Sequence, residues 1–234
     1  MTGYRGILFD KDGTLFDFNA TWVPWSARIL TELAGGDLTL ARRLGARVGY
    51  DLDAGRFEGW SPIVSDTPDV IAAALAPDLP DQSPMEVEAR MVAAAQGVEV
   101  VEATPLAPFL SGLRQSGFAL GVATNDGEAP ARSNLDRVGV TGHFDFIAGY
   151  DSGFAGKPAP DMLLAFAEAV DLLPETVLMV GDSAHDLVAG RAAGMATVGV
   201  LTGVSSRDDL QGLADVVLPD IGHLPAWLGD RTPA

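Results

Sequence analysis

The chain of 234 residues contains no cysteine, which excludes disulfide bonds and thiolate metal sites. It also has no run of eighteen apolar residues, so no transmembrane helix is predicted. Arg5 and Asp10 lie where a signal peptide would need its apolar core, which argues against export. We therefore expect a cytoplasmic protein that has no contact with a membrane.

Basic residues are scarce. The chain has 15 Lys and Arg residues against 32 Asp and Glu residues, and its formal net charge is −17. Because proteins bind nucleic acids through basic patches, nucleic acid is excluded as an expected partner. Lys11 and Lys157 are the only lysines, and both lie beside acidic motifs. A bias towards arginine explains why lysine is rare, but it does not explain where these two lysines lie.

The length allows one large domain, or one domain with a smaller one, and the local patterns favour the second arrangement. Residues 17–101 offer helical patterns and little strand, and we expect them to form an inserted helical domain. Residues 1–16 and 102–234 would then form the core. The signals in the insert are helical apolar spacing over 27–33 and 38–48, helix starts at Thr67-Pro68 and at the capping box 83–86, and a helix end at Gly97.

Beyond residue 104, predicted strands alternate with predicted helices. This alternation predicts an α/β protein with a parallel sheet and right-handed crossovers. The predicted strands are 118–123, 144–148, 176–180, 196–201 and 215–218, and the predicted helices are 106–115, 129–138, 160–170 and 186–193.

The first predicted strand ends in a cluster of acidic residues. Ile7 to Phe9 form a short apolar run, and Asp10, Asp12 and Gly13 follow it. In open α/β sheets, ligands bind at the carboxyl ends of the strands, where these two carboxylates would lie. Gly13 would let the backbone approach a ligand closely. The alternative is an ordinary Asp-Gly turn.

Polar residues also follow later strands. Thr124 follows residues 119–123, Lys157 lies in a Gly-Lys-Pro loop, and Asp182 and Asp186 follow residues 177–180. Each has a simpler interpretation when taken alone. Thr124 could serve a turn and Lys157 could be solvated. Asp182 could cap a helix, and Asp186 could be a favourable charge in the first helical turn.

Taken together, these stretches resemble the four motifs of the phosphatase branch of the haloacid dehalogenase superfamily. Residues 10–14 match the Asp-x-Asp-Gly-Thr motif, and residues 181–186 match Gly-Asp-x-x-x-Asp. Thr124 and Lys157 match the second and third motifs. The four occur in the right order, and the resemblance covers nearly the whole chain. It implies a Rossmann-like parallel sheet with an α-helical cap inserted after the first motif, most similar to the phosphoglycolate phosphatase-like group.

The resemblance also implies a role for each motif residue. Asp10 would be the nucleophile that forms an aspartyl-phosphate, and Asp12 would protonate the leaving oxygen and later activate water. Lys157 would neutralise negative charge on Asp10 and on the phosphate. The implied phosphate-binding residues are Gly13, Thr124, Asn125 (through its backbone) and Lys157.

Four gathered carboxylates would repel one another without a cation. Mg²⁺ prefers oxygen ligands and joins one or two carboxylates with a phosphate oxygen, so we expect a magnesium site. The resemblance assigns Asp10, Asp182 and the backbone carbonyl of Asp12 as ligands. It gives Asp186 the task of orienting either a metal-bound water or Lys157.

These expectations describe a Mg²⁺-dependent phosphatase, a phosphoric monoester hydrolase, that acts on a small phosphorylated metabolite as a monomer or homodimer. Dehalogenases of the superfamily lack an Asp at the position of Asp12, which favours phosphate transfer. A sugar phosphomutase shares the motif and stays an alternative, as does a catalytically silent binding protein. In the helical domain, Arg42, Arg43 and Arg47 could bind a substrate carboxylate or pair with neighbouring acidic residues.

Overall fold

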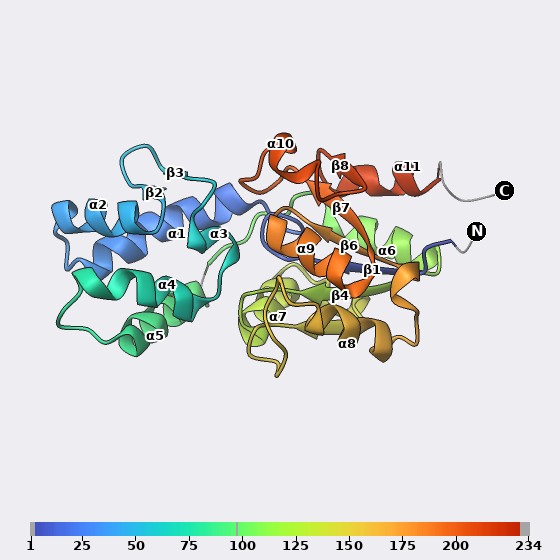
Figure 1. The fold of residues 1–234 in the computed structure, drawn as a ribbon, viewed down its shortest axis with the longest axis horizontal. Coiled ribbons are helices and arrows are strands. Elements are labelled where there is room, and N and C mark those ends of the chain that lie inside the picture. Colours follow the sequence, from blue (N-terminus) through green and yellow to red (C-terminus); the bar gives the residue numbers. More distant parts are fainter. Residues whose placement is uncertain (1–2, 97, 230–234) are drawn as a thin grey trace. The chain divides into compact units, whose positions relative to one another are not determined.

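The computed structural model describes residues 3–96 and 98–229. Gly97, where a helix end was predicted, lies outside this part. The described residues form two compact units (Figure 1). An α/β unit contains the described residues up to Asp17 and from Val101 onward, and a helical unit runs from Phe18 to Val100.

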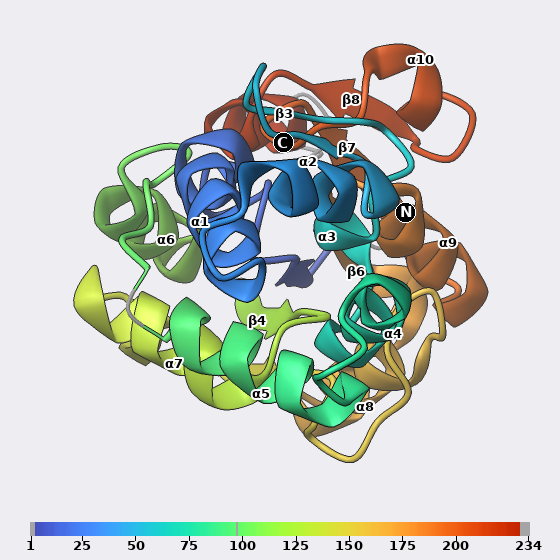
Figure 2. The same ribbon diagram turned by 90° about the vertical axis from the view of Figure 1, so that its left-hand side faces the viewer.

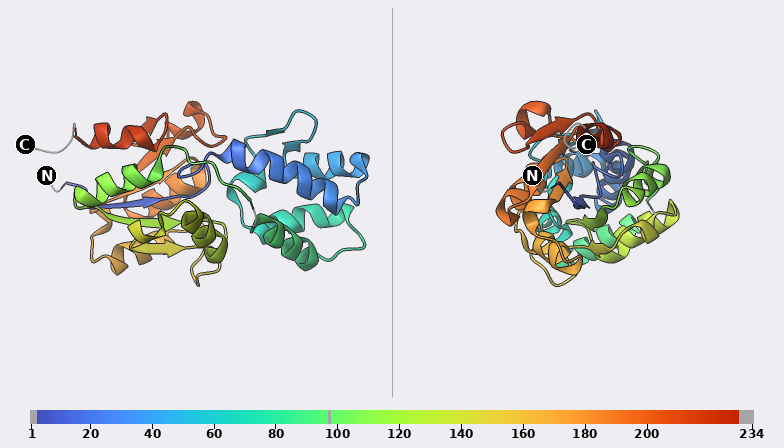
Figure 3. Two further views of the ribbon diagram at one scale, coloured as in Figure 1. Left: turned by 180° about the vertical axis from the view of Figure 1, so that it is seen from behind. Right: turned by 90° about the vertical axis from the view of Figure 1, so that its right-hand side faces the viewer.

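The α/β unit is built on a six-stranded sheet in the order β5-β4-β1-β6-β7-β8. Figure 3 shows this unit from behind, with helices beside its strands. Every neighbouring pair is parallel, which confirms the predicted α/β class. The strands are β1 (Gly6–Phe9), β4 (Ala119–Ala123), β5 (Phe146–Ala148), β6 (Val177–Gly181), β7 (Ala196–Val200) and β8 (Val216–Leu218).

The register of the three central strands brings the motifs to one edge. Phe9 at the end of β1 pairs with Val122 of β4 and with Val180 of β6. The strands therefore end at the same level, and the polar residues that come after each one emerge side by side. The Asp10 N–H extends this pairing because it donates to the Val180 carbonyl over 2.8 Å.

Helices cover both faces of the sheet, which explains why β1 is a continuous apolar run rather than an alternating one. Leu8 packs with Phe166 of α8 and Ala189 of α9 on one face. Phe9 packs edge to face against Phe109 of α6 on the other, with ring centroids 6.1 Å apart. The α-helices of this unit are α6 (Leu106–Gln115), α7 (Glu128–Arg137), α8 (Asp161–Ala169), α9 (Ala184–Ala193), α10 (Arg207–Leu210) and α11 (Leu224–Gly229).

In the helical unit, α1 runs beside α2 and α4 runs beside α5 (Figure 2). The capping box predicted at Ser83 is present, with Glu86 as its second member. Thr67 occupies the N-cap position of α4, but its side chain does not cap the helix. The elements are α1 (Phe18–Leu33), α2 (Leu38–Arg47), β2 (Tyr50–Asp51), β3 (Arg56–Phe57), α3 (Pro62–Ser65), α4 (Pro68–Leu75) and α5 (Pro84–Ala95).

The first helix of this unit is longer than predicted. It begins at Phe18 rather than at Ala27, and it contains Pro24. Phe18, Trp22 and Trp25 are buried at helical spacing and continue the apolar stripe of the predicted segment. The predicted start lies too late in the chain because a proline inside a pattern usually marks a helix boundary.

The arginines of α2 pair with acidic residues of the same unit. Arg42 Nε lies 2.9 Å from Asp53 Oδ2, and Arg47 Nε lies 2.5 Å from Asp78 Oδ2. Arg43 Nε lies 3.1 Å from the other oxygen of Asp78. These contacts support the simpler of the two predicted roles, pairing within the unit.

Within the part of the chain that the structure describes, no helix is both long and apolar enough to cross a membrane.

Candidate active site

A buried lysine joins two carboxylates at the C-terminal edge of the sheet. Lys157 Nζ lies 2.6 Å from Asp10 Oδ1 and 2.6 Å from Asp186 Oδ1. Burial acts to lower the pKa of Lys157, but the Asp10 and Asp186 carboxylates outweigh burial and raise it. The ammonium group is therefore charged at neutral pH. Sequence motifs that are far apart in the chain meet at this one nitrogen.

The side chain of Asn125 holds the backbone of Lys157. Asn125 Nδ2 donates to the Lys157 carbonyl over 2.9 Å, and the Lys157 N–H donates to Asn125 Oδ1 over 2.9 Å. Sequence reasoning assigned a function only to the Asn125 backbone and missed this two-bond clamp. An amide side chain directly after Thr124 at a strand end was the only signal, and it does not reveal a partner 32 residues away.

Asp186 has two partners. Its Oδ1 contacts Lys157, and its Oδ2 accepts hydrogen bonds from the Ser183 N–H at 3.0 Å and the Ser183 hydroxyl at 2.7 Å. Ser183 is thus the N-cap of α9 and Asp186 completes its capping box. The alternative in which Asp182 caps this helix is wrong. Asp186 both stabilises the helix start and orients the lysine.

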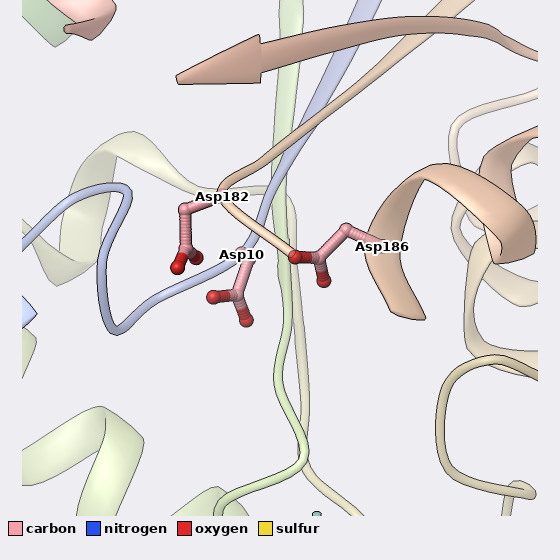
Figure 4. Close-up of side chains that lie close together, drawn as sticks. All are labelled: Asp10, Asp182 and Asp186. Atoms are coloured by element: carbon pink, nitrogen blue, oxygen red, sulfur yellow. The ribbon is translucent and has the colours of Figure 1, made fainter. Parts of the chain in front are cut away.

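Three buried carboxylates gather around this lysine. An oxygen from each of Asp10, Asp182 and Asp186 lies within 4.8 Å of the others, and Figure 4 shows them turned into the same space. Burial raises the pKa of Asp10 to about 7; Lys157 acts against this rise, and Asp186 adds to it. Burial and the charges of Asp186 and Asp10 also raise the pKa of Asp182. The single positive charge of Lys157 does not offset the negative charge of these three carboxylates.

The donor set fits a hard divalent cation. Asp182 Oδ2 is buried, and it accepts no hydrogen bond from the residues that the structure describes. Its other oxygen accepts a long hydrogen bond, 3.4 Å, from the Thr14 hydroxyl. Unpartnered carboxylate oxygens next to a second buried carboxylate are ligands that suit Mg²⁺. Asp10 and Asp182 could hold such an ion, and the contact of Asp186 with Lys157 favours its predicted supporting role.

Two glycines make room for the Asp182 carboxylate. Gly13 has a φ of 82°, and a Cβ there would lie 2.4 Å from Asp182 Cγ. A Cβ on Gly203, in the loop after β7, would lie 1.7 Å from Asp182 Oδ2. The neighbouring Thr202 hydroxyl donates to the Gly13 carbonyl over 2.5 Å. Sequence reasoning missed Thr202 and Gly203, since a Thr-Gly pair after a strand is also typical of an ordinary loop.

Gly13 was predicted to help bind phosphate, and its backbone N–H already has a partner within its own loop. Its N–H donates to the Phe16 carbonyl over 2.7 Å, so this amide is engaged within its own loop. Thr124 is buried, its N–H donates to Ala148 of β5 over 3.0 Å, and its Oγ1 accepts from the Asp126 N–H over 3.0 Å. Thr124 therefore does serve a turn. Its hydroxyl group lies at the same strand end as Asp10.

Asp12 is paired with the other lysine. Lys11 Nζ lies 2.5 Å from Asp12 Oδ2 and 3.0 Å from Asp126 Oδ2, and the lysine side chain is fully buried. Burial acts to lower the pKa of Lys11, but the Asp12 and Asp126 carboxylates outweigh it and raise that pKa. The site therefore contains two separate lysine–carboxylate clusters, one on Asp10 and one on Asp12.

The fold and this edge define an α/β enzyme whose active site combines lysine and carboxylate groups at the ends of parallel strands. The chain belongs to the haloacid dehalogenase-like hydrolase family, whose model matches residues 4–194. The residues that carried the sequence resemblance are those that the sheet gathers at this edge.

Curated proteins that are similar to the chain carry phosphatase names. Phosphoglycolate phosphatase of Escherichia coli K12 is 27% identical over 96% of this chain and 92% of that protein. A Dickeya dadantii protein named probable phosphatase IndB is 35% identical over 108 residues, which cover 46% of this chain and 47% of that protein.

Solved structures share the fold. A predicted phosphoglycolate phosphatase from Haemophilus somnus has a TM-score of 0.77 and 20% identity, and the match covers 97% of this chain and 99% of that one. A Thermotoga maritima protein assigned as a beta-phosphoglucomutase has a TM-score of 0.68 and 20% identity, and the match covers 97% of this chain and 100% of that one. At this identity, the likenesses establish the fold and not the reaction.

The raised pKa of Asp10 predicts that Asp10→Asn stabilises the metal-free protein. The Asp10 pKa is about 7 in the folded state against an ordinary value of 3.8. Above pH 7, Asp10 is ionised in the folded and the unfolded state, so the folded state carries the whole free-energy penalty of this buried charge. The penalty shrinks as the pH falls from 7 towards 4. In thermal unfolding with chelator, the variant should gain of the order of 2 kcal/mol at pH 8 and less at pH 5.

The exposed Asp53 supplies the control, because Asp53→Asn should change stability by less than about 0.5 kcal/mol at either pH. Adding Mg²⁺ should stabilise the parent more than Asp10→Asn. A variant that is less stable than the parent at pH 8, or equally affected at both pH values, would contradict this description of the cluster.

The close approach of the Asp182 carboxylate to Gly203 predicts that Gly203→Ala weakens Mg²⁺ binding at the candidate metal site. The new methyl group must displace the Asp182 carboxylate, and changes in groups that orient a ligand lower metal affinity about 10- to 100-fold. Calorimetric titration of the chelator-treated protein with Mg²⁺ measures this loss. Gly212→Ala is the matched control, since a Cβ at Gly212 meets nothing within 4 Å. Equal affinities for the two variants would remove Asp182 from the metal site.

Proposed function

We propose that the chain is a Mg²⁺-dependent phosphatase that hydrolyses a small phosphate monoester through an aspartyl-phosphate on Asp10. The observation that carries this proposal is the contact of Lys157 Nζ with Asp10 Oδ1 at 2.6 Å, inside a cluster of buried carboxylates. Membership of the hydrolase family and the similarity to phosphoglycolate phosphatases support it. Phosphoglycolate itself is one candidate among small phosphate esters.

In the first step, Asp10 attacks phosphorus. Lys157 holds Asp10 Oδ1, which leaves Oδ2 to form the bond to phosphorus while the bond to the leaving oxygen breaks. Asp12 gives its proton to that oxygen, so the product leaves as a neutral alcohol. Lys157 also neutralises charge that builds up on the phosphoryl oxygens. Its own position is set by Asp186 and by the Asn125 clamp.

In the second step, water cleaves the aspartyl-phosphate. Asp12, now ionised, takes a proton from the water as the water oxygen attacks phosphorus. The bond between phosphorus and Asp10 breaks, and inorganic phosphate and the free carboxylate result. One residue thus serves as acid and then as base, and the enzyme returns to its starting state.

The phosphoryl oxygens need hydrogen-bond donors besides Lys157. Thr124 is our first candidate, because its Oγ1 accepts from the Asp126 N–H and its hydroxyl hydrogen has no acceptor among the residues that the structure describes. The Asn125 N–H, next along the chain, is the second. Gly13 contributes space rather than a donor, since its N–H is bonded to Phe16.

The proposed metal ligands are the side chains of Asp10 and Asp182 and the backbone carbonyl of Asp12. A bound Mg²⁺ would supply positive charge that offsets these carboxylates and the phosphate. Asp186 would act on Lys157 and not as a ligand.

The helical unit would act as a cap that selects the substrate, since the residues at the sheet edge recognise only the phosphoryl group. A cytoplasmic location also stays a prediction.

A sugar phosphomutase is the nearest alternative. A mutase passes its aspartyl-phosphate to a second sugar hydroxyl, whereas a phosphatase admits water. Incubation with a hexose 1-phosphate separates the two, because the phosphatase releases inorganic phosphate and the mutase yields the hexose 6-phosphate. A silent binding protein would show neither product. The lysine, the nucleophile and the Asp12 acid are all present, which favours an active enzyme.

Removal of the metal should abolish phosphatase activity. The three carboxylates repel one another and the incoming phosphate, so excess chelator should reduce turnover of p-nitrophenyl phosphate by at least about 10²-fold. Added Mg²⁺ should restore it, and Ca²⁺ should restore it poorly because Ca²⁺ takes more ligands in a looser geometry. Full activity in excess chelator would contradict the assignment of a catalytic metal ion.

Asp12→Ala should separate the two steps. Nitrophenolate leaves without a proton, so the variant should still transfer phosphate from p-nitrophenyl phosphate to Asp10. Water activation then fails, and a stopped-flow trace should show a burst of up to about one nitrophenolate per site and then slow turnover. A methyl phosphate ester should give neither phase. Parental rates on both esters, with metal binding intact, would show that Asp12 is not the acid and base.

A further inference from the structure

A second buried lysine lies in the site without a task in the two catalytic steps. The side chain of Lys11 is fully buried, and its ammonium lies between Asp12 and Asp126. Moving an ammonium group out of water costs several kcal/mol, and a paired carboxylate often does no more than offset that cost. An apolar residue would fill this position at least as well if packing were the only demand. The lysine therefore indicates a functional demand on its neighbours.

Both ends of the Lys11–Asp126 pair are fixed by the backbone. The Lys11 carbonyl accepts hydrogen bonds from the Leu15 N–H at 2.9 Å and the Phe16 N–H at 3.1 Å. On the other side, Asp126 Oδ1 accepts from the Gly127 N–H at 2.7 Å, and the Asp126 N–H donates to Thr124 Oγ1 at 3.0 Å. The pair thus links the loop after β1 to the loop after β4.

Asp12 is held by one oxygen only. Its Oδ2 lies 2.5 Å from Lys11 Nζ, whereas its Oδ1 accepts no hydrogen bond from the residues that the structure describes. A carboxylate with one oxygen anchored and the other unengaged has a defined orientation. Acid–base catalysis needs such an orientation, because the proton must pass to one particular atom.

We propose that Lys11 and Asp126 are positioning residues that hold the Asp12 carboxylate in the orientation required for proton transfer to the leaving oxygen. The proposal deepens the proposed function and rests on it. Lys11 anchors Asp12 Oδ2, Asp126 anchors Lys11, and Asp12 Oδ1 carries the proton. Thr124 accepts from the Asp126 N–H, so the same loop orders the acid and a candidate phosphate donor.

The two roles open to Lys11, structural and positioning, differ in their dependence on the leaving group. An acid matters most when the leaving oxygen is strongly basic, so loss of positioning should hurt alkyl esters and spare p-nitrophenyl phosphate. A loosened structure, or a weakened metal site, should slow every ester alike. The diagnostic quantity is the slope of log rate constant against the pKa of the leaving alcohol.

The experiment measures single-turnover rate constants, with Mg²⁺-saturated enzyme in excess, for p-nitrophenyl, phenyl and methyl phosphate. The variants are Lys11→Met, which keeps the length of the side chain without its charge, and Asp126→Asn, which keeps the lysine on Asp12. Arg114→Met is the control for loss of a cation. Arg114 pairs with Asp145, which directly precedes β5, and this pair lies away from the loops after β1 and β4. Circular dichroism and Mg²⁺ titration accompany each variant.

For Lys11→Met we expect methyl phosphate to lose about 10- to 100-fold, within the range of acid–base catalysis, while p-nitrophenyl phosphate loses less than about threefold. Asp126→Asn should shift the slope in the same direction by less, and it carries the test if Lys11→Met does not fold. In an Asp12→Ala background, where methyl phosphate should not react, Lys11→Met should leave the slope between the p-nitrophenyl and phenyl esters unchanged, since Lys11 acts through Asp12. Arg114→Met should match the parent.

An unchanged slope in both variants overturns the proposal, whether the rates fall equally or do not fall. A further change of slope in the Asp12→Ala background also overturns it. These outcomes leave the proposed function intact as long as the parent cleaves the esters and the phosphoryl group is found on Asp10. A parent that cleaves no ester overturns the proposed function and the positioning role together.

Discussion

The site depends on the balance of charge at one buried nitrogen. Lys157 Nζ contacts Asp10 and Asp186 at 2.6 Å each, and a third carboxylate, Asp182, lies beside them. Burial raises the pKa of Asp10 and of Asp182, and the neighbouring carboxylates add to this rise because one ammonium does not balance three carboxylates. In the proposed function, the same excess of negative charge attracts a cation, and the bound cation then attracts the phosphate of the substrate. Stability, metal affinity and reactivity are therefore linked.

The parallel sheet makes this crowding possible. Phe9, Val122 and Val180 are in register, so three strands end together and place the residues after them at one edge. Backbone contacts then fix each group: Asn125 clamps the Lys157 backbone, and Ser183 binds Asp186 at the start of α9. In the proposed mechanism a second lysine, Lys11, does for the acid what Lys157 does for the nucleophile. The stability of the scaffold offsets the repulsion inside the site.

Much of this could be predicted from the sequence. The apolar runs ending in Asp10, Thr124 and Asp182 predicted parallel strands, and parallel strands bring the residues at their carboxyl ends together. The parts that could not be predicted are contacts between distant loops, such as Thr202 and Gly203 against Gly13 and Asp182. Local patterns also failed in the helical unit, where Pro24 hid the first turns of α1 and the strands Tyr50–Asp51 and Arg56–Phe57 were too short to show alternation. Local sequence patterns predict which residues end a strand, but they do not predict which residues from distant loops contact them.

The central claim is that a phosphoryl group is transferred to Asp10 itself. Acid quenching within milliseconds of mixing Mg²⁺-loaded Asp12→Ala protein with p-nitrophenyl phosphate should preserve the intermediate, since an acyl phosphate is stable in acid over the time of the analysis. Digestion and mass spectrometry should then place the mass of one phosphoryl group on the peptide that contains Asp10, and substitution of Asp10 by Asn should remove it. A phosphoryl group on any other residue, or phosphate release with no phosphorylated protein at any time, would contradict the account.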